Sequence, residues 1–545
     1  MPEEQLDRRT YLKFAGGAAA SAALAGCAGG GDGTTTGTTS DDGSGDGDGD
    51  GDVDGGPPED FSVTITQGQM PSTLDPHNHR ETTTDNVVLQ AYEGLLARDK
   101  DGKIVKRLAT GYERVEEGTV KFTIRDGPTF HSGEDLTPED VAYSVNRVVD
   151  PEVGLEGGFE SPQRDQLAGV TGAEVVDGER AVRVNSDGIN PIVFAQFASY
   201  CDVMQKQWVQ DHEKKYIAKN MNGTGPFELT DYNESVKVVF ERNEDYWQEN
   251  AAISKLTFNA AKESSTRVNQ LLNDETDIVV NVPPQDASRV KQSGSASLAP
   301  VPSTRIIYNA MRYDVEPFSS PEFRRAMNLA IDLESIIDNV LSGFADQTGQ
   351  PTLEGFTGYN DDVGPYETNK SKAEDLVEES GHAGASITLH TPVGRYLKDV
   401  EIAQAVARQI DELSNVSCSV NQRDFNTLAG ELTDGDLETS PKFYLIGWGN
   451  ATFDATQTIL PLLTTDGALT SYSNEEVDTL MSEAQSMAGG SNRQSKLKEA
   501  NKLLHDEAPW IYLNRQYSVY GVSGRLQWDA RRDERIEAYA ISPSS

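Results

Sequence analysis

The sequence predicts an α/β fold, and three observations support this prediction. Ile387–His390, Ser417–Val420 and Phe443–Ile446 each read as a strand, and a helical pattern with one apolar face covers 399–413 between the first two. Strands that alternate with helical segments are typical of βαβ units with parallel strands. In addition, about 485 residues follow the N-terminal region, enough for two or three domains.

The N-terminal segment indicates export. Arg8 and Arg9 form a twin-arginine pair, and an apolar run of about 13 residues from Phe14 to Gly26 ends at Cys27. This run is too short to span a bilayer, which takes about 20 residues. Twin arginines, a short apolar region and small residues are typical of an export signal. The stretch before Cys27 resembles a lipobox, so we expect 1–27 to be a signal and Cys27 the lipidated first residue of a protein held at the extracellular face of the cell membrane.

Residues 28–60 are expected to form a disordered acidic linker. They hold ten acids, no bases and almost no apolar side chains, so they cannot bury enough surface to offset the entropy of ordering. The spacing of Asp46, Asp48 and Asp50 opens like a calcium loop. The twelfth position is Pro57, however, where such a loop needs a bidentate glutamate. A solvated, flexible acidic linker without specific calcium binding is the preferred interpretation.

The remaining chain is strongly acidic. The whole chain carries −41, the linker −10 and residues 1–27 zero, which leaves −31 on residues 61–545. Such a charge excludes nucleic acid as a partner. Repulsion among these charges destabilises the folded protein at low ionic strength but is well screened in molar salt, where the Debye length is about 3 Å. A halophilic protein is therefore expected, with an acidic mesophilic protein as the alternative.

Two cysteines remain after Cys27, and Cys201 and Cys418 lie far apart in the sequence. A disulfide framework is excluded. Two buried free thiols are expected, and a single bridge between them stays open.

The folded part opens with a strand, a turn and a helix. Phe61–Thr66 alternates like a strand, and a helical stretch lies around Val87–Tyr92. A second alternating strand, Val120–Arg125, runs into a turn. A helix then begins at Pro138, because Thr137 can cap it and Asp140 can complete a capping box.

Residues 122–151 resemble the signature region of the peptide/nickel class of extracellular solute-binding proteins (family 5) that serve ATP-binding-cassette importers. Four further stretches resemble motifs of the same family in order: Gly223–Phe227, Glu241–Trp247, Pro317–Asp332, which Ser320 can cap as a helix, and Glu507–Ile511. The match covers most of 61–545.

This resemblance implies a two-lobed fold with a split first lobe and a ligand cleft between the lobes. Lobe 1 would comprise 61–303, with its inserted subdomain, plus 512–545, and lobe 2 would comprise 304–511. It also implies a monomer without cofactors that hands a solute to the permease and ATPase subunits of an importer.

The segments after the βαβ run predict two helices and a returning strand. Ser473 with Glu476 and Ser491 with Gln494 have the spacing of capping boxes. The chain then returns as a strand over Trp510–Val522.

Enzyme signatures are weak. His212 and Glu213 begin like a zinc-protease motif, but the second histidine is missing, and neither a nucleophile elbow nor a phosphate loop is present. His77 and His79 could meet a metal, although a polar loop pair is the preferred interpretation. We therefore expect no catalytic residues and no metal site, with an exported hydrolase as the less favoured alternative.

The solute is harder to predict. Peptide-binding members of the family resemble one another in a G-W-x-x-D stretch whose aspartate receives the α-amino group of the peptide. Here the matching position is Ala451, and Asp454 lies three residues further on.

Six residues are candidates for ligand binding. Arg395 is a candidate anion clamp with Tyr396 beside it, since this segment resembles the place where dipeptide-type members bind a carboxylate. Trp448 would give the cleft an aromatic wall, and Asp454, Thr82 and Thr83 complete the set. Peptide is the leading expectation, followed by a sugar or another small solute and then nickel.

Overall fold

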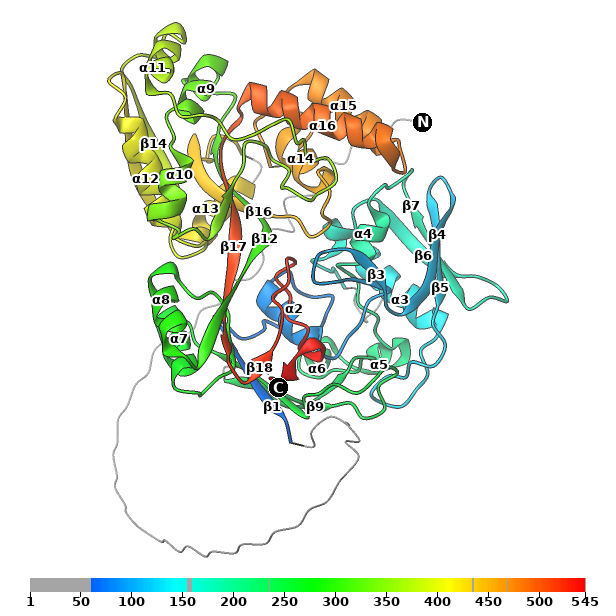
Figure 1. The fold of residues 1–545 in the computed structure, drawn as a ribbon. Helices are drawn as coiled ribbons and strands as arrows, with labels where there is room; N and C mark the ends of the chain where they lie inside the picture. Colours follow the sequence, from blue (N-terminus) through cyan, green and yellow to red (C-terminus); the bar gives the residue numbers. More distant parts are fainter. Residues whose placement is uncertain (1–59, 154–158, 235, 434–435, 468, 545) are drawn as a thin grey trace, which may run out of the picture.

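A computed structural model describes residues 60–153, 159–234, 236–433, 436–467 and 469–544. The predicted signal, most of the predicted linker and the lipidation position Cys27 lie outside these ranges. The described chain forms a mixed α/β structure of two lobes (Figure 1). We call lobe 1 the half that contains β1 and lobe 2 the half that contains β14.

One large sheet runs through both lobes and joins them. Its two long central strands, β12 (Ala296–Met311) and β17 (Trp510–Ser523), are antiparallel and cross from one lobe to the other (Figure 1). Their pairing register shifts between Pro302 and Ile306. Irregularities of this kind bend strands and disrupt the ladder locally, so the crossing point is the natural place for the lobes to bend against each other.

Lobe 1 holds one end of this sheet. Strands β1 and β10 are parallel, as are β1 and β11, while β8, β9 and β10 form an antiparallel meander. The strands in sheet order are β11 (Ile278–Val279), β1 (Ser62–Gln67), β10 (Lys255–Ala260), β9 (Lys237–Arg242) and β8 (Phe227–Asn233). The helices are α2 (Thr82–Val88), α5 (Lys206–Asp211), α6 (Lys214–Ile217), α7 (Ser264–Leu272) and α8 (Pro284–Ser293). The helix expected around Val87–Tyr92 is α2, which ends at Val88, and turns follow it.

A second sheet is inserted in lobe 1 and has its own apolar core. Its four antiparallel strands are, in sheet order, β4 (Ala109–Glu116), β5 (Thr119–Ile124), β7 (Ala181–Ser186) and β6 (Val170–Val175). The elements around it are β2 (Leu96–Arg98), β3 (Ile104–Lys106), α3 (Pro138–Val149), η1 (Arg164–Leu167) and α4 (Val193–Phe197). After β17, the chain ends in lobe 1 with β18 (Leu526–Gln527), η2 (Ala538–Ala540) and β19 (Ser542–Pro543).

Lobe 2 contains the predicted βαβ run. Strand β14 is parallel to both β15 and β16. Helix α12 follows β14 in the sequence and precedes β15. The strands are β13 (Ala345–Gln347), β14 (Ala385–Pro392), β15 (Val416–Arg423) and β16 (Phe443–Gly449). The helices are α9 (Pro321–Leu329), α10 (Leu333–Asn339), α11 (Lys370–Glu379), α12 (Asp399–Asp411), α13 (Phe425–Thr433), α14 (Thr456–Leu463), α15 (Glu475–Gln485) and α16 (Gly490–Glu507). Two apolar cores result, one packed under α9 to α12 and one under α14 to α16.

The capping predictions succeed at two helices and fail at two. Thr137 and Asp140 form both bonds of a capping box at α3, and Ser320 caps α9. The prediction at Ser473 is wrong because the next residue, Asn474, accepts the first-turn N–H groups of α15. The prediction at Ser491 is also wrong. Helix α16 begins one residue before Ser491, and its cap position is Gly489, which offers no side chain.

Several of the motifs that resemble the family meet at Glu93 in lobe 1. The buried Glu93 carboxylate accepts hydrogen bonds from Thr224 (2.9 Å), Tyr246 (2.8 Å) and Trp247 (2.8 Å). Beside them, a Cβ at Gly223 would lie 1.9 Å from the Ala91 carbonyl oxygen, so only glycine fits. These motif residues therefore stabilise lobe 1.

The arginine near the end of α3 also has a structural role. Arg147 is fully buried and pairs bidentately with Asp75 at 2.7 and 3.0 Å. It also contacts His77 Nδ1 at 2.9 Å, while His77 Nε2 lies 2.7 Å from the Asp202 carbonyl oxygen. Burial and the Arg147 charge lower the His77 pKa to about 3, so the ring stays neutral. His77 thus belongs to a buried polar network.

The two cysteines of the folded part are free. Cys201 is buried, as expected, but Cys418 on β15 is only partly buried. The bridge left open by the sequence is not formed.

Candidate solute-binding cleft

The two lobes face each other across an open groove of about 590 Å³. Lobe 1 contributes residues around the β2–β3 turn and the start of α4, and lobe 2 contributes the loops before α14 and α16. The lining residues used below are Arg98, Thr452, Phe453, Asp454 and Arg493. Because both lobes form its walls, this groove closes or opens when the lobes move.

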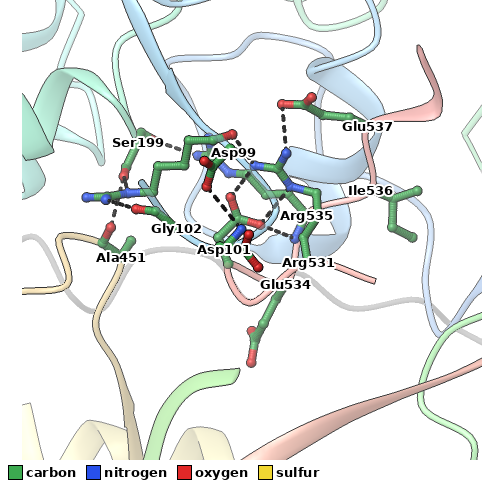
Figure 2. Close-up of polar contacts among 12 residues, drawn as sticks. Asp99, Asp101, Gly102, Ser199, Ala451, Arg531, Glu534, Arg535, Ile536 and Glu537 are labelled. Atoms are coloured by element: carbon green, nitrogen blue, oxygen red, sulfur yellow. Dashed lines mark hydrogen bonds and ion pairs between the residues drawn. The ribbon is translucent and has the colours of Figure 1, made fainter. Parts of the chain in front are cut away.

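Arg98, at the end of β2, joins the lobes. Its guanidinium donates to the carbonyl oxygens of Gly102 (2.6 Å) and Thr452 (2.9 Å) and lies 4.4 Å from the Phe453 ring centroid. Ser199 of lobe 1 donates to the Ala451 carbonyl oxygen at 2.9 Å (Figure 2). Among the described residues, no ion pair joins Arg98 to a carboxylate, and burial lowers its pKa to about 10. A desolvated cation therefore lies beside Ala451.

Trp448 lies near the end of β16, and Asp454 lies in the loop that follows this strand. Trp448 is half-buried, packs on the core under α14 to α16 and donates to the Gln457 carbonyl oxygen at 3.2 Å. Asp454 is buried and pairs bidentately with Arg493 of α16 at 2.7 and 2.9 Å. A cationic ligand group would have to compete with Arg493 for this carboxylate.

Arg395 and Tyr396 lie in the loop between β14 and α12. The Asp399 carboxylate accepts the backbone N–H groups of Gly394, Arg395 and Tyr396, which fixes the loop. Tyr396 is buried and donates to the Gly447 carbonyl oxygen at 3.2 Å, so this loop contacts the end of β16. The Arg395 guanidinium lies over the rings of Phe425 (4.9 Å) and Tyr396 (5.2 Å).

Sequence reasoning missed Arg305, a second arginine near Arg395. It lies on β12 opposite Gly449, and a Cβ at Gly449 would be 3.1 Å from its Nη2. The Arg395 pKa is lowered first by burial and second by the Arg305 charge, so the two cations interact. The only sequence signal was its position at the predicted lobe boundary.

Thr82 and Thr83 begin α2 in lobe 1. The Thr83 hydroxyl accepts from the Gln69 amide at 2.9 Å, and both residues are partly exposed. Within the described ranges, no hydrogen bond joins either threonine to Arg395, Tyr396, Trp448 or Asp454. Asp85, one turn further, lies 3.9 Å from Arg535 of the C-terminal segment.

Among the residues that the structure describes, no group of three or more potential ligands could hold a metal ion. His79, unlike His77, has no hydrogen bond at either ring nitrogen. No helix in the described ranges is long and apolar enough to cross a membrane.

Comparisons with known proteins agree with this geometry. The family model described as bacterial extracellular solute-binding proteins, family 5 Middle, matches residues 103–469. The glutathione-binding protein GsiB of Salmonella typhimurium is 24% identical over 463 residues, which is 83% of this chain and 88% of the relative. The substrate-binding protein CtaP of Listeria monocytogenes superposes with a TM-score of 0.79 at 21% identity, covering 90% of this chain and 100% of that one. DppA of Helicobacter pylori, in complex with the peptide STSA, gives 0.74 at 19% identity, covering 89% and 99%.

Proposed function

Because the chain belongs to family 5 of the extracellular solute-binding proteins, we propose that it captures a small solute between its lobes and delivers it to the permease and ATPase subunits of an ATP-binding-cassette importer. The observation that carries this proposal is the pair of strands β12 and β17, which cross between the lobes at a register shift beside an interlobe groove. Strands of this kind let two rigid halves close around a ligand. An exported hydrolase is the weaker candidate, and turnover of a peptide or glycoside by the purified protein would favour it.

The solute class we propose is a peptide or peptide-like acid that does not depend on a free amino group. The ligands in the names of the relatives, glutathione and the peptide STSA, support a peptide. Ala451 supplies no carboxylate, and the buried cation of Arg98 lies next to it. An α-amino group at this point would be repelled, whereas an N-blocked or anionic group would not. Sugar and nickel remain alternatives.

The experiment is recovery of the natural solute. Protein produced in its own host at high salt would be denatured, the released solute identified by mass spectrometry and then titrated back by calorimetry. Recovery of an N-blocked or acidic peptide with saturable binding supports the proposal. Recovery of ordinary free-amino peptides that bind equally well to wild type and Ala451→Asp would contradict the proposed solute class.

We also propose that a lipid on Cys27 anchors the protein outside the cell after twin-arginine export. The motif at 8–27 supports this. Cys27→Ser should release the protein to the medium, and replacement of Arg8 and Arg9 by lysine should block export. Unchanged membrane retention of Cys27→Ser would refute the anchor.

The charge of −31 on residues 61–545 supports a halophilic environment. Its self-repulsion weakens as salt screens it. We therefore expect the melting temperature to rise steeply between low and molar salt. A flat profile would contradict this part of the proposal.

A further inference from the structure

An ion pair between the lobes links the C-terminal segment to β12. Glu534 Oε2 lies 3.5 Å from Arg305 Nη2, and both side chains are mostly buried, with 14% and 16% of their surfaces exposed. Glu534 follows β18 in lobe 1, while the neighbours of Arg305 on β12 pair with β16 of lobe 2. The pair therefore connects the C-terminal segment of lobe 1 to the part of β12 that pairs with lobe 2.

The backbone at Glu534 has an unusual conformation. Its φ is 65°, in the left-handed region that residues with a Cβ rarely adopt. Both neighbours are bound elsewhere: Asp533 pairs with Arg531 at 2.5 Å, and Arg535 reaches Ser199 and Asp85. Figure 2 shows Glu534 pointing away from the cluster of Arg531 and Glu537. Among the charged residues of 531–537, Glu534 is thus the one that pairs with Arg305.

The charged groups at this place are not all paired in the same way. Arg305, Glu534 and Asp399 all act on the Arg395 pKa. The Asp399 carboxylate is engaged by backbone N–H groups of the loop. Glu534 pairs with Arg305, but within the part of the chain that the structure describes, no ion pair joins Arg395 to a carboxylate. Its guanidinium instead lies over two aromatic rings. Of these two guanidinium groups, that of Arg305 has a carboxylate partner, and that of Arg395 is left for a ligand.

We propose that Glu534 is a built-in carboxylate that sets how many acid groups the solute can carry. With Glu534 on Arg305, the cleft accepts one solute carboxylate at Arg395. A second carboxylate near Arg305 meets the like charge of Glu534 and must displace it. This inference rests on the proposed function and defines its solute class as mono-acids.

The test uses two probes of nearly equal shape, N-acetyl-Ala-Gln with one carboxylate and N-acetyl-Ala-Glu with two. Calorimetry at one fixed salt concentration would compare wild type with Glu534→Gln, which keeps the size of the side chain. Wild type should prefer the mono-acid. Glu534→Gln should raise the affinity for the di-acid about tenfold or more, since like charges a few ångströms apart repel strongly at partly buried sites, and should change the mono-acid affinity less than threefold.

Two controls separate this effect from net charge and misfolding. Asp529→Asn removes an exposed carboxylate from the same segment and should leave the ratio of the two affinities unchanged. Arg305→Gln added to Glu534→Gln should abolish the gained affinity for the di-acid. If wild type binds the mono-acid but Glu534→Gln leaves the ratio unchanged, the inference is wrong and solute binding stands. If wild type and variants bind neither probe, the peptide-like solute class is wrong and the inference with it.

Discussion

The guanidinium of Arg98 in lobe 1 donates a 2.9 Å hydrogen bond to the carbonyl oxygen of Thr452 in lobe 2. The same side chain lies over Phe453 of lobe 2. Together with the Ser199 hydroxyl, which donates to Ala451, it forms a direct protein contact across the cleft. These contacts therefore help to hold the two lobes in the arrangement that the structure shows, and closer approach of the lobes would keep them.

Arg98→Ala should make the closed arrangement less stable. Charge-assisted hydrogen bonds contribute roughly 1.5–3 kcal/mol, so the solute Kd should rise about tenfold or more because closure is coupled to binding. Calorimetry with the recovered solute would measure this. Lys100→Ala, which removes an exposed cation nearby, is the matched control. An affinity equal to wild type in Arg98→Ala would show that the contact does not favour closure.

Ala451→Asp should change the preference for the solute amino group. The new carboxylate would restore a partner for an α-amino cation, a charge-assisted interaction of roughly 1.5–3 kcal/mol. Wild type should bind an N-acetylated dipeptide better than the same dipeptide with a free amino group, and the variant should reduce or reverse this preference. Ala451→Asn, which adds similar volume without charge, should not. Equal preferences in all three proteins would contradict the assigned role of this position.

Asp202 should make the stability of lobe 1 depend on pH. Burial raises its pKa from 3.8 to about 6 in the folded protein, with Arg535 opposing the shift. The folded state therefore binds the proton more tightly than the unfolded state. The contribution of Asp202 to the free energy of unfolding should be largest below about pH 4. It should fall by at most about 3 kcal/mol as the pH rises through about 6 and then level off.

Asp202→Asn should flatten this profile and stabilise the protein at pH 7. Urea unfolding between pH 4 and 7.5 at constant molar salt would measure both effects. Asp187→Asn, at an exposed position, should follow the wild-type profile. A wild-type profile retained in Asp202→Asn would assign the pH dependence to another group.

Arg147→Ala should strongly destabilise lobe 1. It leaves the Asp75 carboxylate buried and unpaired, and breaking a buried ion pair in this way costs about 3–5 kcal/mol. Thermal or urea unfolding would measure this loss. Arg164→Ala, which removes an exposed arginine of the same lobe, should cost less than about 0.5 kcal/mol. Similar losses for both variants would refute the structural role of the Arg147 network.

The sequence predicted elements whose signals are local. The capping box at Thr137 and the alternation of strands and helices over 385–449 are set by neighbouring residues, and both are present. Local signals also failed where two neighbouring residues could cap the same helix. Ser473 was expected to be the N-cap of α15, but Asn474 is the N-cap residue.

The charge pairing of the cleft could not be predicted from sequence. Arg305 and Glu534 lie far apart in the chain and meet because the chain returns to lobe 1 after β17. Asp454 is held by Arg493 for a similar reason, since α16 packs beside its loop. In so acidic a chain, spacing alone cannot indicate which carboxylate meets which arginine.

Small-angle X-ray scattering of the solute-free and solute-loaded protein tests the central claim most directly. The protein would be stripped of solute by unfolding and refolding in molar salt, then measured with and without the recovered solute. We predict that the radius of gyration falls when the solute binds and that the change saturates with the calorimetric Kd. A radius of gyration that does not change at saturating solute would contradict capture by lobe closure.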